Sequence, residues 1–200
     1  QYLNEKDPLK SYRDQFYFPQ HKKGEQAIYL CGNSLGLQPV GAEKAIGEHL
    51  ESWKELGVKG HFEGKKPYTT YHEKLGQKMA RLVGALEEEV VVMNSLTVNL
   101  HLMMVSFYRP TSKKYKILIE KDAFPSDQYA VKSQLEYLGY DAEKGLLELE
   151  SRPGETLLRT QDILDFIDKN GDEIALIMLG GINYYTSQAY DMKEICKKGK

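Results

Sequence analysis

Apolar positions in the first half of the chain recur at steps of three and four residues, the spacing of one face of an α-helix. Between residues 39 and 56 this face comprises Ala42, Ile46, Leu50, Trp53 and Leu56. A second such pattern covers residues 71–82 and is followed by Gly84, a residue type that often ends a helix. Both patterns predict amphipathic helices whose apolar faces pack into a core.

Other apolar runs lack this spacing and predict buried strands. Residues 90–93 and 174–179 are apolar without alternation, and residues 115–119 are so apart from Lys116, as expected for strands that are covered on both faces of a parallel sheet. Residues 146–149 predict a further short strand. We read residues 90–107 as a strand, a tight turn and a buried helix.

Helical segments alternate with these strands. They are expected at residues 96–107, 126–138, 161–170 and 192–198. Ser126 or Asp127 is placed to cap the second of them, and Gly139 to end it. Strands that alternate with helices predict an α/β fold, with a parallel or mostly parallel sheet flanked by helices.

Composition excludes several classes of function. The 200 residues carry a formal net charge of −2 with acids and bases interspersed, so no basic stripe indicates nucleic acid as a partner. Cys31 and Cys196 lie far apart and form no CxxC pair, which favours a reducing compartment. No apolar run approaches the roughly 20 residues of a membrane-spanning helix. We expect a cytoplasmic protein without a membrane partner.

The first candidate for chemistry is the turn Asn94-Ser95-Leu96-Thr97, at the expected start of a helix. Unpaired N–H groups and the positive end of the helix dipole make such a turn suitable for a phosphate group. The alternative is a hydroxyl that only caps its own helix.

The second candidate, Ala123-Phe124-Pro125-Ser126-Asp127, directly follows the predicted strand at residues 115–119. Ligands of open α/β sheets usually bind beyond the carboxyl ends of the strands, so we expect both turns to face one crevice. Phe124 could stack on a flat heterocycle and Asp127 could balance its positive charge. Alternatively, Phe124 is a core residue and Asp127 a helix cap.

Other motifs are less specific. The turn that contains Asn33 and Ser34 has two glycines four residues apart and no Lys-Ser/Thr ending, which disfavours nucleotide binding. The five histidines show no metal-ligand spacing, so we expect no metal site. His61 follows Gly60 in a polar loop, where its side chain is free to reach a ligand.

Four blocks of sequence, taken in order, resemble those of kynureninases. They are Gly32-Asn33-Ser34-Leu35-Gly36-Leu37-Gln38-Pro39, Gly60-His61, Asn94 to Leu102, and Phe124-Pro125-Ser126-Asp127. The similarity extends through Tyr184-Tyr185-Thr186. It covers nearly the whole chain, but only about the N-terminal half of a family member.

The resemblance implies the type I fold of pyridoxal-phosphate enzymes, mostly parallel and incomplete in this chain, and a homodimer. It implies hydrolysis of L-kynurenine, or of 3-hydroxykynurenine, to anthranilate or 3-hydroxyanthranilate and L-alanine, by cofactor-dependent Cβ–Cγ cleavage in tryptophan catabolism and NAD biosynthesis. Residues 1–60 would then contribute to a small domain and the substrate site. Residues 61–200 would form the first part of a large cofactor-binding domain.

The resemblance also implies roles for particular residues. Leu96 and Thr97 would contact the cofactor phosphate. Phe124 would lie against the pyridine ring, with Pro125, Ser126 and Asp127 beside it. Asn33, Ser34 and His61 would lie near the substrate.

Two departures from the family pattern affect these expectations. Gly180 stands where some relatives have a serine near the cofactor, and the Schiff-base lysine is expected beyond Lys200. Since this chemistry needs an amine with a lowered pKa, we expect residues 1–200 alone to be inactive. The alternatives are another type I pyridoxal-phosphate enzyme, such as a cysteine desulfurase-like lyase, and a non-catalytic binding or assembly module.

Overall fold

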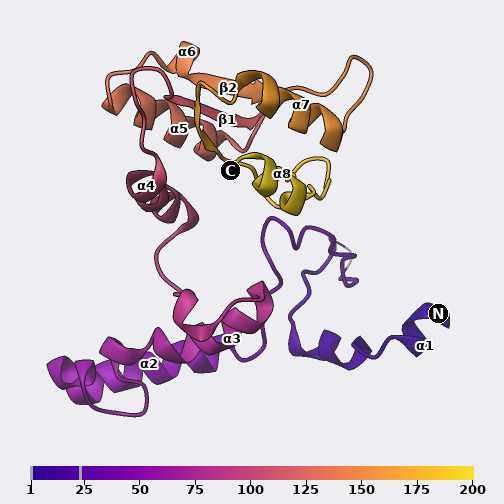
Figure 1. Cartoon of the computed structure of the whole chain (residues 1–200). Coiled ribbons are helices and arrows are strands. Elements are labelled where there is room, and N and C mark those ends of the chain that lie inside the picture. The colour runs from indigo at the N-terminus through magenta and orange to yellow at the C-terminus, as the bar shows by residue number, and fades with distance from the viewer. Residues whose placement is uncertain (1, 23) are drawn as a thin grey trace. The chain divides into compact units, whose positions relative to one another are not determined.

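The chain forms two compact units, Gln1–Val92 and Met93–Lys200, in a computed structural model that describes residues 2–22 and 24–200 (Figure 1). The first unit is helical, with 3-10 helices labelled η. Its elements are α1 (Tyr2–Lys6), η1 (Lys10–Gln15), α2 (Ala42–Leu56), η2 (Gly57–His61), η3 (Tyr68–Thr70), α3 (Glu73–Val83) and η4 (Glu87–Glu89). Both long predicted helices are therefore present.

The first unit buries little of its apolar surface. Among its described residues only Gly60, Gly76 and Ala80 are buried. Ile46, Leu50 and Trp53 on the predicted apolar face of α2 are each more than half exposed, so the prediction that this face packs into a core is wrong for the described residues. The 3.6-residue period of α2 indicates which face is apolar, but not that another element covers it.

The second unit is an α/β layer structure. Its elements are α4 (Leu96–Phe107), β1 (Lys116–Glu120), α5 (Pro125–Tyr137), α6 (Ala142–Gly145), β2 (Leu146–Leu149), α7 (Thr160–Asn170), β3 (Ile174–Ile177) and α8 (Met192–Lys198). The strands pair in the order β2-β1-β3 and all run parallel. The predicted parallel α/β sheet flanked by helices is confirmed for this unit.

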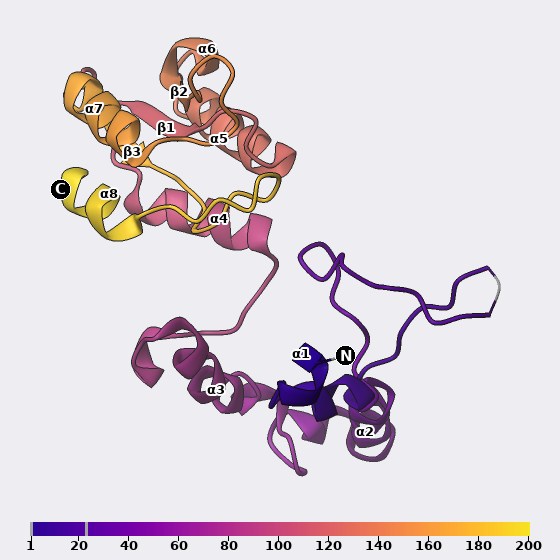
Figure 2. The same ribbon diagram turned by 90° about the vertical axis from the view of Figure 1, so that its right-hand side faces the viewer.

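Alternate side chains of β1 serve the two faces of the sheet, because successive residues of a strand point to opposite sides. Ile117 and Ile119 belong to a core cluster that α4 and α5 complete, whereas Leu118 belongs to a second cluster with residues of α7 and α8. Figure 2 shows α5 and α7 on opposite sides of the strands. The central strand is thus buried on both faces, as its continuous apolar run predicted.

The predicted strand at residues 90–93 is not formed. Val90 has extended backbone (φ −124°, ψ 129°), but residues 90–93 belong to no strand. Extended backbone becomes a strand only where the N–H and C=O groups of a neighbour are within reach. The apolar run therefore indicated the backbone conformation of Val90 correctly and the pairing wrongly, and among the described residues no strand precedes α4.

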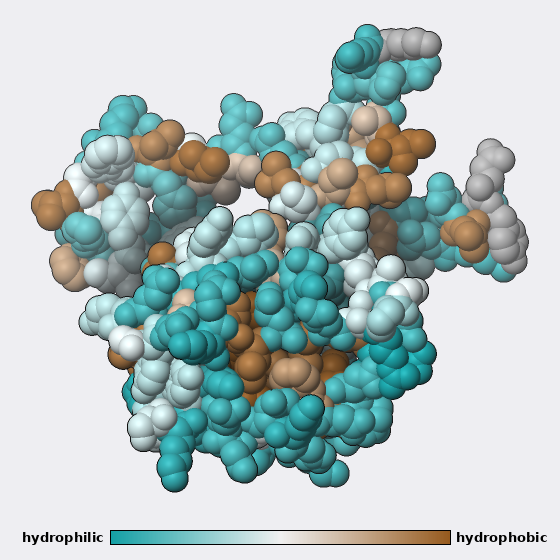
Figure 3. Space-filling view, turned by 90° about the horizontal axis from the view of Figure 1, so that it is seen from above, coloured by the Kyte–Doolittle hydropathy of each residue, from teal (hydrophilic) through white to brown (hydrophobic). Residues whose placement is uncertain are grey.

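Helix α4 has the predicted bounds, but it is not a buried helix. Met104 is its only buried residue, and Leu102, Val105 and Phe107 are exposed. Leu100 and Met104 pack against the core cluster that includes residues of β1 and α5, whereas the other apolar residues of the helix lie outside this cluster. In the space-filling view, apolar residues gather in patches among hydrophilic ones (Figure 3). Among the helices of residues 2–22 and 24–200, none has the length and apolar character needed to cross a membrane.

Candidate functional site

A hollow of about 250 Å³ lies at the carboxyl ends of β1 and β3. It is lined by Leu96, Leu100, Glu120, Ala123, Phe124, Asp127, Met178, Leu179, Gly180, Ile182 and Tyr184. Both turns singled out in the sequence contribute to it, since Leu96 begins α4 while Phe124 and Asp127 belong to the start of α5. The expectation that the two turns face one crevice is therefore confirmed.

The start of α4 is shaped by a left-handed asparagine. Asn94 has φ 50°, a conformation that asparagine tolerates better than most residues. Its side-chain amide donates to Oδ1 of Asn99 at 3.2 Å, and Nδ2 of Asn99 donates to the carbonyl of Met93 at 3.0 Å. Ser95 is the N-cap residue, yet its side chain makes no capping hydrogen bond. The alternative of a hydroxyl that caps its own helix is therefore wrong here.

The start of α5 presents an aromatic ring at the hollow. Phe124 is the N-cap residue and Pro125 occupies the first turn, where a missing N–H costs nothing. The predicted cap by Ser126 or Asp127 is wrong, because both already lie within the helix, where the Ser126 hydroxyl donates to Oδ1 of Asp127 at 3.2 Å. Phe124 is 50% exposed, so it is not the core residue of the alternative interpretation.

Tyr184 packs against Phe124. The two ring centroids are 5.2 Å apart and the planes meet at 83°, a favourable edge-to-face arrangement. Tyr184 follows β3 in the chain, and Gly180 lies between the two. A Cβ atom at Gly180 would lie 3.2 Å from the carbonyl oxygen of Ile182, so a side chain at this position would crowd that carbonyl group.

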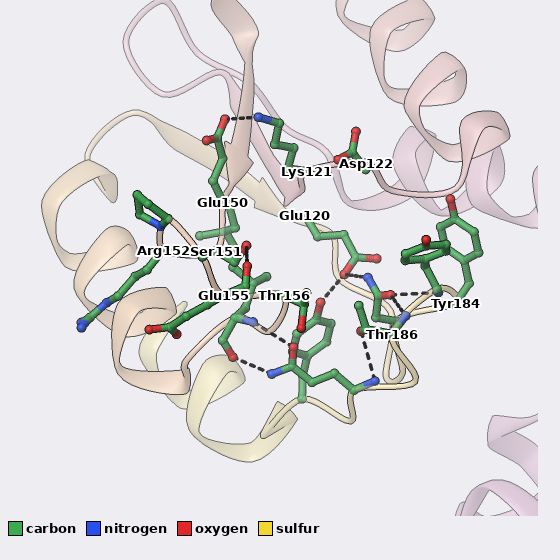
Figure 4. Close-up of a pocket in the computed structure, with 18 residues that line it drawn as sticks. Glu120, Lys121, Asp122, Glu150, Ser151, Arg152, Glu155, Thr156, Tyr184 and Thr186 are labelled. Carbon is green, nitrogen blue, oxygen red and sulfur yellow. Dashed lines mark hydrogen bonds and ion pairs between the residues drawn. The ribbon is translucent and has the colours of Figure 1, made fainter.

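Glu120 is a buried carboxylate that the sequence analysis missed. It ends β1, is 7% exposed and accepts hydrogen bonds at Oε2 from Nδ2 of Asn183, at 3.0 Å, and from the hydroxyl of Tyr190 (Figure 4). Burial, and then the hydrogen bond to Glu120, raise the pKa of Tyr190 above its usual value. An acidic residue that ends a continuous apolar strand was the available signal.

A larger hollow of about 650 Å³ shares Glu120 and Tyr184 with the first (Figure 4). Two cations in its lining are already paired. Lys121 lies 2.8 Å from Glu150, and Arg152 lies 2.6 Å from Asp162. These pairs offset the positive charges, so this hollow is not a strong anion site.

His61 lies in the first unit and lines a different hollow, of about 470 Å³, with His49, Leu50, Trp53, Gly57, Val58 and Tyr68. Its ring meets that of Tyr68 edge to face, with centroids 5.7 Å apart. The hydroxyl of Thr69 donates to the carbonyl of His61 at 2.7 Å. A Cβ atom at Gly60 would lie 3.1 Å from the Tyr68 ring, so the glycine allows the Tyr68 ring to pack closely against the backbone next to His61.

Asn33 and Ser34 lie in an exposed turn of the first unit, in which the backbone N–H of Ser34 donates to the carbonyl of Cys31 at 3.0 Å. They do not contribute to the hollow that His61 lines. Thr97 lies in the first turn of α4 and is exposed. The structure thus brings Leu96, Phe124 and Asp127 together in one hollow. Of the residues predicted near a substrate, Asn33 and Ser34 do not line the hollow that His61 lines.

A parallel sheet flanked by helices makes the second unit an α/β structure, and the hollow at the carboxyl edge of this sheet is its candidate ligand site. Over 195 residues the chain is 56% identical to a kynureninase of Myxococcus xanthus (strain DK1622), covering 98% of this chain and 46% of that protein. It is 53% identical over 197 residues to a kynureninase of Koribacter versatilis (strain Ellin345), with the same two coverages. A kynureninase of Nematostella vectensis is 48% identical over 205 residues, which are 97% of this chain and 44% of that protein.

The chain is a homologue of the kynureninases, and the predicted resemblance is confirmed. It spans about half the length of the relatives it matches. No family model matches the chain.

Proposed function

We propose that this chain is part of an enzyme that hydrolyses L-kynurenine, or 3-hydroxykynurenine, to anthranilate, or 3-hydroxyanthranilate, and L-alanine, in tryptophan catabolism and NAD biosynthesis. One structural observation carries the proposal beyond sequence similarity. Leu96, Phe124 and Asp127 come from two separate turns and line one hollow at the carboxyl edge of the sheet.

We propose pyridoxal 5'-phosphate as the cofactor and the type I fold of its enzymes as the full architecture. The hollow has a volume of about 250 Å³, just below the roughly 300–1,000 Å³ of ligand pockets, which supports a small ligand part such as a single ring. When bound, the cofactor supplies an electron sink for the substrate. Leu96 and Thr97 would hold its phosphate at the start of α4, where backbone N–H groups lack helical partners.

The aromatic part of the cofactor would lie against Phe124, whose ring is half exposed and makes an edge-to-face contact with Tyr184. Asp127 would balance positive charge on the ring nitrogen, with Pro125 and Ser126 beside it. The hollow is lined by no lysine of the described residues, and we expect the Schiff-base lysine beyond Lys200.

For the substrate we propose His61, Asn33 and Ser34 as contacts. The aromatic lining around His61, which includes Trp53 and Tyr68, suits an aromatic ring with polar substituents. A homodimer, a cytoplasmic location and the division into residues 1–60 and 61–200 also belong to the proposal.

The direct test is production of anthranilate from L-kynurenine by the full-length protein with added pyridoxal 5'-phosphate, followed by anthranilate fluorescence. Product that depends on the cofactor is the expected result. Absence of product from a folded, cofactor-loaded protein would overturn the proposal, and turnover of L-cysteine instead would favour a desulfurase-like lyase. A folded protein that does not take up the cofactor would favour a binding module.

The substrate contacts need a separate comparison. His61→Ala and Ser34→Ala should raise KM for kynurenine, whereas His72→Ala, which changes an exposed histidine that does not line the hollow around His61, should leave it unchanged. Equal kinetics for all three variants would remove the assigned roles of His61 and Ser34.

A further inference from the structure

The loop after β3 is tied to β1 by a single buried side chain. Glu120 accepts two hydrogen bonds on one oxygen, from Asn183 and from Tyr190, residues 63 and 70 positions further along the chain. A buried carboxylate is costly unless hydrogen bonds stabilise it, and a buried donor without an acceptor also costs free energy, although less. The three side chains therefore hold one another in place.

Asn183 connects this anchor to the turn that carries Tyr184. Its Nδ2 donates to Glu120, while its Oδ1 accepts the backbone N–H groups of Tyr185 and Thr186 at 2.9 and 2.8 Å. One planar amide thus fixes the turn relative to the end of β1. The ring of Tyr184 leaves this turn toward Phe124.

The rest of the loop is hydrogen-bonded to the same residues. The N–H of Asn183 donates to the carbonyl of Gln188 at 2.9 Å, and the N–H of Tyr190 donates to the carbonyl of Gly181 at 3.1 Å. The side chain of Gln188 in turn bonds both the N–H and the carbonyl of Leu158. A displacement at Glu120 would therefore be transmitted to Tyr184 instead of being absorbed locally.

We propose that Glu120 is a positioning residue for the hollow. Through Asn183 and Tyr190 it holds Tyr184 in its edge-to-face contact with Phe124, and so sets the orientation of the ring that faces a ligand. The effect on cofactor binding rests on the proposed function, in which Phe124 lies against the cofactor. The arrangement of Tyr184 and Phe124 can be measured with or without a cofactor.

The first experiment measures that arrangement in the cofactor-free full-length protein, with 4-fluorophenylalanine at position 124 and ¹⁹F NMR. Tyr184→Leu removes the neighbouring ring and provides the reference shift. Glu120→Ala is expected to move the resonance toward this reference. Glu120→Gln keeps an oxygen that accepts both hydrogen bonds and is expected to remain near the unsubstituted protein. A folded Glu120→Ala protein with an unchanged resonance would overturn the proposal.

If Glu120→Ala does not fold, Tyr190→Phe decides the question. It removes one of the two donors and leaves the bond between Asn183 and Glu120, so a smaller shift in the same direction is expected. An unchanged resonance in folded Tyr190→Phe would overturn the proposal equally.

The second experiment measures pyridoxal 5'-phosphate affinity and the visible circular dichroism of the bound cofactor. Glu120→Ala is expected to weaken binding about tenfold and to change the dichroic band, because a buried donor is left without its acceptor. Tyr108→Phe is the control for a loss of stability alone, since it removes a hydrogen bond from a buried phenol to the carbonyl of Tyr115, and Tyr108 does not line the hollow. It should lower the melting temperature and leave the band unchanged.

The two experiments separate two kinds of failure. If the unsubstituted protein does not bind the cofactor, the proposed function fails, while the ¹⁹F resonances still decide the role of Glu120. If the cofactor binds and Glu120→Ala changes neither its affinity nor its dichroic band, the positioning role in binding is wrong and the proposed function stands.

Discussion

Gly180 forms part of the wall of the hollow, and the resemblance to kynureninases leads us to expect a serine near the cofactor at this position in some family members. A Cβ atom there would lie 3.2 Å from the carbonyl of Ile182, so Gly180→Ala should slightly weaken cofactor binding through crowding. Gly180→Ser introduces the same Cβ together with a hydroxyl. If that hydroxyl reaches the cofactor, the serine variant should bind about fivefold more tightly than the alanine variant, which corresponds to one net hydrogen bond of about 1 kcal/mol. Titration with pyridoxal 5'-phosphate measures both, and equal affinities would exclude the contact.

Two buried tyrosines predict a loss of stability in alkali. Burial is the main cause that raises the pKa of Tyr108 to about 12, and it also raises the pKa of Tyr190. The folded state then keeps protons that the unfolded chain releases above its usual tyrosine pKa of about 10. This contribution to stability is complete below pH of about 10 and is lost as pH rises through the raised pKa values.

Urea unfolding at several pH values above about 9 measures this loss. Tyr190→Phe and Tyr108→Phe should each show a smaller decline with pH than the unsubstituted protein. The same decline in all three proteins would show that other groups cause it.

The residues of the hollow were predictable only where local sequence places them. Leu96, Phe124 and Asp127 follow directly from a turn, a strand end and a helix start. Glu120 and Asn183 were missed because their bond joins positions 63 residues apart, and spacing along the chain does not contain that information.

At the scale of elements, two glycines in helices predict opposite effects of the same substitution. A Cβ atom at Gly145, in α6, would lie 2.8 Å from a methyl group of the fully buried Leu135. Gly145→Ala should therefore destabilise the protein by about 1–3 kcal/mol through overpacking. Gly47, within α2, has nothing within 4 Å of its Cβ position, so Gly47→Ala should stabilise by about 0.5–1 kcal/mol through helix propensity.

Chemical denaturation of both variants tests this pair of predictions. The contrast between them is more informative than either value, since the chemical change is identical. Stabilisation of the same size by both substitutions would mean that the contact between α6 and Leu135 is looser than described.

Elements were predictable in so far as a local period or a local stop signal defines them. Helices α4 and α8 and strand β2 have the predicted bounds, and β1 is displaced by one residue. The prediction of a strand at residues 90–93 was wrong because a strand needs a hydrogen-bonding partner. The prediction that α4 is buried was wrong because burial needs neighbouring residues on every side. Strand pairing and burial both depend on the arrangement of the whole molecule.

For the whole molecule, the uneven core predicts uneven protection of the backbone. Ile117, Leu118 and Ile119 of the central strand are at most 1% exposed, whereas the described residues of the first unit include three buried ones. Amides of β1 should therefore exchange with deuterium most slowly and those of α2 much faster. Mass spectrometry of the exchanged full-length protein measures both, and equal protection of the two segments would contradict the prediction.

The class of fold was predictable because the alternation of strands and helices is a property of the whole sequence. The family was predictable because four short blocks occur in order, although each alone is ambiguous. The role of His61 and Ser34 as substrate contacts stays a prediction.

The side chain of Gln188 also determines where the chain should tolerate insertions. Its side-chain amide makes with Leu158 the pair of hydrogen bonds that the peptide group of an adjacent strand would otherwise make. Asparagine, shorter by one methylene, would leave both groups of Leu158 unsatisfied, so the reach of this side chain ties the two loops to a fixed separation. Gly154, at the open tip of the partner loop, has φ 81° and nothing within 4 Å of its Cβ position. Insertions should therefore be tolerated at that tip and disruptive between residues 183 and 190.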